Sequence, residues 1–117
     1  MRRESDVRVH VLNVQAPLIH VWVSKLVTPD MIDAKLRSDG KKVLVQAEMV
    51  ALSAGVACVP HVSIGAVAEE INAYATRHGC DAIVMGTRGM GVVAGLVLGS
   101  VAQRVVHLAT VPVTLVK

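Results

Sequence analysis

The chain has 117 residues, a length that holds one domain and leaves no room for a second. Hydrophobic residues make up 53% of the sequence, which excludes an intrinsically disordered protein. The net charge is +3 and the basic residues are scattered, so a nucleic-acid partner is not indicated. Trp22 and Tyr74 are the only aromatic residues, so the core must be aliphatic. The 24 valines favour strands that are covered on both faces.

Neither export nor membrane insertion is indicated by the sequence. The first six residues lead into no apolar signal segment. The longest run without a charged residue, 49–68, is long enough to span a membrane. It contains Gly55 and Pro60, which a lipid-exposed helix would not carry together. Cys58 and Cys80 lie in apolar runs, so we expect buried free thiols in a reducing cytoplasm.

The first half of the chain predicts a strand followed by a long helix. Valines alternate with other residues over 7–14, the pattern of a strand. Thr28 as N-cap and Pro29 in the first turn predict a helix that runs to residue 54 and ends at Gly55. Gly40 lies inside this helix and costs about 1 kcal/mol relative to alanine. We therefore expect a kink or break there.

The second half continues the alternation of strand and helix. The sequence predicts strands at 56–63, 81–85 and 111–116. Helices are predicted between them, at 65–78 and 100–109. Pro60 and Pro112 place the first and last of these strands at sheet edges, because proline cannot donate to the ladder. The strand at 81–85 is almost wholly apolar and is expected to be central. The alternation predicts an α/β fold with a parallel sheet, in a single domain.

A glycine-rich segment follows the strand at 81–85, at the end of a strand where α/β sheets bind ligands. It includes Gly86, Gly89 and the pair Gly99-Ser100. Backbone N–H groups can point at an anion there, and Ser100 is expected to cap the following helix, whose dipole attracts phosphate. A flexible turn before an ordinary helix cap is the alternative interpretation. The segment has no lysine for a Walker A loop, and its spacing does not fit the dinucleotide fingerprint.

The spacing of these glycines, G-x2-G-x9-G-S, resembles the pattern of the universal stress protein family. Four further segments are similar to those of the family, at 63–71, 80–89, 98–102 and 109–116. The resemblance covers residues 7–117. It implies the adenine nucleotide alpha hydrolase-like fold of that family, an open parallel sheet with flanking helices.

The resemblance also implies a site for ATP, with or without Mg²⁺. The residues that would line the phosphates and ribose are Met85, Gly86, Gly89, Gly99, Ser100 and Val101. The backbone of Val14 would meet the adenine. The family pattern implies a cytoplasmic stress-response regulator that hydrolyses ATP slowly at most and is not an enzyme. It further implies a homodimer paired through the last strand, with no nucleic-acid or membrane partner.

The sequence departs from the family at its start. The family's first strand is central in the order 3-2-1-4-5 and ends in an acid that helps to hold base and ribose. No strand precedes 7–14 here, and Asp6 and Asp81 lie at strand starts, the wrong end for this role. A gap of about 9.6 Å would separate the flanking strands. We expect the strands to close up or a partner chain to fill the gap, with a truncated chain as the third explanation. ATP affinity is expected to be weakened.

Other chemistries find little support. None of the histidines has the spacing of a metal site; they stand at positions 10, 20, 61, 78 and 107. There is no nucleophile elbow. Arg88 can contact a phosphate or, equally, solvent and a partner subunit. An ATPase is disfavoured because no residue can be named to position the attacking water. Two functions remain: a nucleotide-binding regulator, and a homodimeric interaction module of the same fold that does not bind nucleotide productively.

Overall fold

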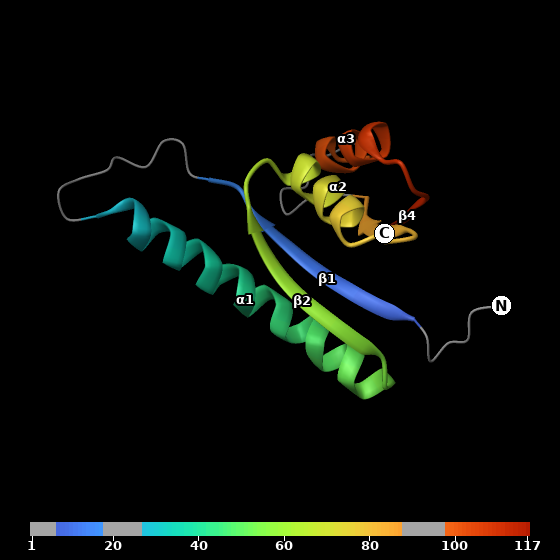
Figure 1. Ribbon diagram of the computed structural model, residues 1–117, viewed down its shortest axis with the longest axis horizontal. Coiled ribbons are helices and arrows are strands. Elements are labelled where there is room, and N and C mark those ends of the chain that lie inside the picture. Colours follow the sequence, from blue (N-terminus) through green and yellow to red (C-terminus); the bar gives the residue numbers. More distant parts are fainter. Residues whose placement is uncertain (1–6, 18–26, 88–97) are drawn as a thin grey trace. The chain divides into compact units, whose positions relative to one another are not determined.

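A computed structural model describes residues 7–17, 27–87 and 98–117 (Figure 1). The elements in chain order are β1 (Arg8–Gln15), α1 (Pro29–Ala54), β2 (Ala57–Ile64), α2 (Val67–Arg77), β3 (Ile83–Gly86), α3 (Ser100–Leu108) and β4 (Val113–Val116). Each lies within two residues of its predicted boundaries, and the paired strands are parallel. The α/β prediction is therefore confirmed.

The chain divides into two compact units, Met1–Gly65 and Ala66–Lys117. In the first unit, β1 and β2 pair in parallel from Arg8 with Ala57 to Gln15 with Ile64. Parallel neighbours need a long crossover, which α1 supplies. This helix packs along both strands (Figure 1).

Both ends of α1 are set by the residues that predicted them. The Thr28 hydroxyl accepts a hydrogen bond from the Met31 N–H at 3.1 Å, which satisfies one of the unpaired N–H groups of the first turn. Gly55 adopts the left-handed conformation with φ 68°, and its N–H turns back to the last carbonyls of the helix. Glycine adopts this conformation without steric penalty, so the helix ends there.

The kink expected at Gly40 is wrong, because α1 is continuous from Pro29 to Ala54. Gly40 is buried, as are Leu36 and Leu44 one turn to either side. A Cβ atom at position 40 would lie 2.6 Å from Cγ1 of Val62 in β2. The glycine thus allows the helix to approach the strands closely, and this packing offsets its low helix propensity.

Among the described residues, β2 pairs with β1 alone, which agrees with the edge position that Pro60 predicts. Its ladder to β1 has a continuous register, and the N–H of Gly65 donates to the carbonyl of Gln15 at 3.0 Å. Odd-numbered residues of β2 therefore turn their backbone groups toward β1, and Pro60 faces away. The N–H that proline lacks would point to the open side of the strand.

The second unit contains α2, α3 and the strands β3 and β4. These strands pair in parallel from Ile83 with Val113 to Gly86 with Val116. Its core is aliphatic, as predicted. The buried residues that form it are Ala68, Ala75, Ile83 and Val105. Gly79, with φ 61°, follows the end of α2 where the sequence predicts a stop.

The strands do not form one continuous sheet within the described ranges. β1 pairs with β2 and β3 pairs with β4, as two separate ladders. The two strands that would flank the family's first strand, β1 and β3, belong to different units, so their closure stays a prediction. The central position of β3 stays a prediction: its one strand neighbour among the described residues is β4, in the same unit, and Val84 is 69% exposed. An apolar run predicts covered faces, but it does not show which strand will cover an edge.

Within the three described ranges, no helix combines the length and hydropathy that crossing a membrane requires.

Candidate functional site

The glycine-rich segment begins and ends at neighbouring points of the second unit. Thr87 directly follows β3, and its N–H donates to the carbonyl of Val116 at 2.9 Å. Its own carbonyl accepts a hydrogen bond from the N–H of Gly99 at 2.6 Å. The carboxyl end of β3 and the N-terminus of α3 are thereby tied together. The predicted site residues that this arrangement brings together are Met85, Gly86, Gly99, Ser100 and Val101.

Side-chain burial separates these residues into two kinds. Met85 and Val101 are partly buried and pack against the core cluster of the second unit. Gly86 and Ser100 are exposed. A ligand at this place would therefore meet the backbone of Met85 and Val101 rather than their side chains.

The N-terminus of α3 differs from the prediction in its cap. Gly99 is the N-cap, and Ser100 is the first residue of the helix, so the capping role expected of Ser100 is wrong. Serine could cap only from the position before the helix, and Gly99 occupies it: its backbone is extended and its carbonyl accepts the first bond of the helix, from the N–H of Gln103 at 3.0 Å. Gly99 has φ −66°, which any residue adopts, so its conformation does not require glycine.

The first turn of α3 is suited to an anion. Its leading N–H groups lack carbonyl partners within the helix, as in every α-helix, and the helix dipole places partial positive charge there. The turn contains no acidic residue, whereas the first turn of α2 carries Glu69 and Glu70. Of the two helices in this unit, α3 is thus the one whose N-terminus carries no side-chain carboxylate.

Two of the predicted contacts lie outside the described residues, namely Gly89 and Arg88. Val14 lies near the end of β1, half-buried, with Ser63 as its partner in the ladder. Val14 and the glycine-rich segment belong to different units.

Among the described histidines, cysteines and acids, no group of three or more could hold a metal ion. Cys58 and Cys80 are free thiols, but both are half-buried rather than fully buried as predicted. The rings of Tyr74 and His78 are stacked, with centroids 4.1 Å apart. Burial raises the pKa of Tyr74 above its usual value of 10.0.

One interaction of the second unit was missed by the sequence analysis. Arg104 in α3 donates from Nε to Oε1 of Glu69 in α2 at 2.6 Å. This hydrogen bond lowers the pKa of Glu69 below its ordinary value of 4.5. The sequence shows Glu69 only as an acid in the first turn of α2, where it stabilises the helix dipole. No local pattern links two residues 35 positions apart, so the pair is visible only in the folded chain.

We expect the Glu69–Arg104 pair to stabilise the protein at neutral pH and not in acid. The pKa of Glu69 is lower in the folded state, so the folded carboxylate releases its proton more readily. The stabilisation is therefore complete above the ordinary pKa and is lost as the pH falls through the folded value. The effect is small because both side chains are about half exposed. Urea unfolding of Glu69→Gln, Arg104→Gln and the double variant should give a smaller coupling energy at pH 3 than at pH 7. An equal coupling energy at both pH values would contradict this assignment.

Comparison with known proteins decides the family. The model of the universal stress protein family matches residues 1–117. The chain belongs to the universal stress protein family. This confirms the resemblance inferred from the glycine spacing.

Individual universal stress proteins resemble the chain over most of its length. It is 35% identical over 88 residues to a universal stress protein of Methanocaldococcus jannaschii, covering 75% of this chain and 52% of that protein. It is 34% identical over 88 residues to YxiE of Bacillus subtilis, covering 75% and 60%. The chain thus spans about half to three fifths of the length of these relatives. The solved structure of the protein MJ0577 superposes with a TM-score of 0.82 at 25% identity, over 94% of this chain and 75% of that one.

Proposed function

We propose that this universal stress protein binds ATP, with Mg²⁺, at its glycine-rich segment and acts as a regulator in the cellular stress response. The observation that carries the proposal is the hydrogen bond between Gly99 and Thr87, which joins the end of β3 to the N-terminus of α3. This is the place at which phosphates bind in α/β folds. Membership of the family supports the same ligand.

In this proposal the backbone does most of the binding. N–H groups at the start of α3 and in the segment between Gly86 and Gly99 would donate to the phosphates, and Val14 would contact the adenine. The family's acid at the end of its first strand has no counterpart assigned in this sequence. A lost charge-assisted hydrogen bond weakens binding by roughly 1.5–3 kcal/mol, or about 10- to 150-fold. Weak affinity and poor discrimination between ATP and GTP are expected.

Replacement of Gly89 by valine should abolish nucleotide binding. Gly89 is one of the three spaced glycines, and a branched side chain there would stand where backbone must approach the phosphates. A ligand at 100 times its Kd stabilises a protein by about 2.7 kcal/mol, so millimolar Mg-ATP should raise the Tm of the unmodified chain. A similar shift is expected with GTP. Gly89→Val should show no shift with either nucleotide.

Gly91→Val is the matched control, because Gly91 lies in the same segment but outside the spaced pattern. It should retain the nucleotide-induced shift. Equal shifts in Gly89→Val and the unmodified chain would refute the phosphate site. A large shift with micromolar ATP alone would mean that another residue or chain supplies the adenine and ribose contact.

The second candidate is a homodimeric interaction module without productive nucleotide binding, and the edge of β4 favours it. Pro112 O accepts from the N–H of Ile83, so the backbone groups of Val113 and Leu115 face away from β3. This edge can pair with the same edge of a second copy about a two-fold axis. A dimer at micromolar concentration, together with no Tm shift from any nucleotide, would favour the interaction module over ATP binding.

A further inference from the structure

α1 is apolar on the side that faces the strands and again on a second, exposed side. The inner side buries Leu36 and Leu44. The second side carries Val45, Met49 and Leu52, which are 50%, 63% and 81% exposed. These three positions follow the i, i+4, i+7 spacing that places side chains along one stripe of a helix. We call them the outer stripe. A helix with two apolar sides normally has both covered.

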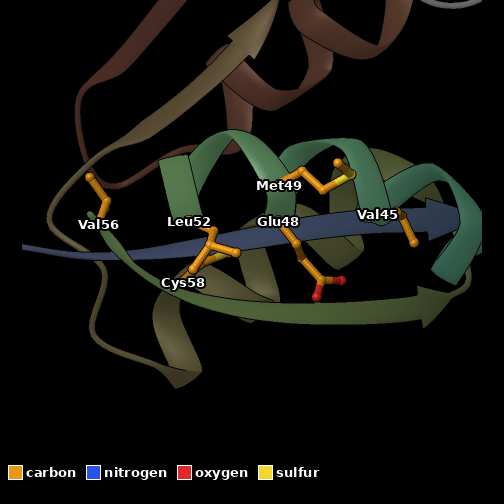
Figure 2. Close-up of a pocket in the computed structure, with 6 residues that line it drawn as sticks. All are labelled: Val45, Glu48, Met49, Leu52, Val56 and Cys58. Atoms are coloured by element: carbon orange, nitrogen blue, oxygen red, sulfur yellow. The ribbon is translucent and has the colours of Figure 1, made fainter. Parts of the chain in front are cut away.

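A shallow hollow lies beside the outer stripe. It has a volume of about 440 Å³, and Figure 2 shows the residues that line it: Val45, Glu48, Met49, Leu52, Val56 and Cys58. Its lining is apolar apart from the thiol and the carboxylate of Glu48. Such a hollow matches a side chain with an apolar stem and a cationic end, which is the chemistry of lysine.

The helix itself carries a lysine in a matching position. Lys41 and Glu48 are seven residues apart, about two turns, so both lie on the same flank of the outer stripe. Both are exposed, and neither forms an ion pair in the described part of the chain. By contrast, Lys35 pairs with Asp39 on the same helix at 2.9 Å.

We propose that the outer stripe is an interface between two copies of this chain, whose α1 helices pair antiparallel about a two-fold axis. In such a pair, residues on the same flank of each helix face one another. An axis midway between Lys41 and Glu48 therefore brings the lysine of each copy to the glutamate of the other. The two Val45 side chains meet beside the axis, and Met49 and Leu52 pack along the second copy around Ser38.

The hollow completes this arrangement. The stem of the second copy's Lys41 lies along the apolar lining, and its ammonium group reaches Glu48. The same contact occurs twice because the interface is isologous. The interface uses α1 and is therefore independent of the β4 edge. If both interfaces form, the expected assembly is larger than a dimer.

A charge exchange tests the pairing. Lys41→Glu and Glu48→Lys each place like charges opposite one another, which should raise the dissociation constant of this association at least tenfold. The double variant Lys41→Glu/Glu48→Lys restores opposite charges and should return it to the unmodified value. Lys42→Glu alters the net charge equally but lies on the other flank, and should have a much smaller effect. Sedimentation equilibrium measures all four. A double variant no tighter than the single variants would overturn the proposal.

A disulfide identifies the occupant directly. In a background with Cys58→Ser and Cys80→Ser, the substitution Val45→Cys should allow a disulfide to cross-link two chains under mild oxidation. Val43→Cys is the control, since Val43 is similarly exposed, at 55%. It should not cross-link, because it lies about 200° around the helix from Val45. Circular dichroism of both variants checks that they are folded. Equal cross-linking at the two positions, or none at position 45, would show that the outer stripe does not meet a second copy.

Discussion

Replacement of Gly40 by alanine should destabilise the protein, although alanine is the better helix former. In an exposed helix this change would stabilise by about 1 kcal/mol. Here the added Cβ would lie 2.6 and 2.9 Å from the two Cγ atoms of Val62 and 3.0 Å from Oδ1 of Asn13. Val62 is buried in β2, and its branched side chain has little rotamer freedom with which to move aside. Overpacking of this kind costs roughly 1–3 kcal/mol, and the gain in helix propensity offsets about 1 kcal/mol, so the free energy of unfolding should fall by up to about 2 kcal/mol.

Two further variants separate packing from helix propensity. Ser38→Ala, at an exposed position of the same helix, should stabilise by a few tenths of a kcal/mol. In a Val62→Ala background, which removes the two methyl groups that clash, Gly40→Ala should become neutral or stabilising. Urea unfolding of the four combinations at positions 40 and 62 measures this coupling. Additive effects would show that contact with Val62 is not the cause of the destabilisation.

Val105→Ala should have the largest effect among conservative substitutions in the second unit. Val105 lies in α3 with no exposed surface, in the core with Ala68, Ala75 and Ile83. The small alanines around it cannot extend into the space that two methyl groups leave. The lost burial and the residual cavity should cost about 2–3 kcal/mol, a large part of the 5–15 kcal/mol that is typical of a domain.

The next residue along the helix provides the control. Val106 is 48% exposed, so Val106→Ala removes the same methyl groups from a surface position. It should change the free energy of unfolding by less than about 0.5 kcal/mol. Urea unfolding followed by circular dichroism compares the two variants, and amide exchange at Ile83 reports the second unit by itself. Similar losses for both substitutions would mean that helix propensity, rather than the core, sets the cost.

Local signals account for the parts of the fold that could be predicted. Thr28 and Gly55 define α1 from cap to cap because capping depends on residues within one turn of the helix end. Pro60 places β2 at an edge because the missing N–H is a property of one residue. Gly40 misled the prediction because its role depends on Val62, which is distant in sequence. The ion pair between Glu69 and Arg104 was missed for the same reason.

In the candidate site, too, the features set by neighbouring residues could be predicted, and those that depend on a distant contact could not. The spacing of Gly86 and Gly99 predicted which strand end and helix start come together, since both belong to one β–α connection. The cap of α3 was assigned to Ser100 because hydroxyl residues are common at that position. The cap falls instead on Gly99, whose extended backbone directly precedes the helix and whose N–H is bonded to the carbonyl of Thr87. A hydrogen bond between the two ends of the glycine-rich segment cannot be predicted from the residues next to Ser100.

The backbone of β2 has a consequence for solubility at high concentration. An exposed strand edge can template a strand of another molecule, and repeated addition of this kind leads to aggregates. Along the open side of β2 the donors alternate with acceptors, and Pro60 interrupts that row near the middle of the strand. A strand that docked there would leave one of its carbonyl groups without a donor and would meet the proline ring. Unfolded or partly folded copies of the chain should therefore accumulate poorly on this edge.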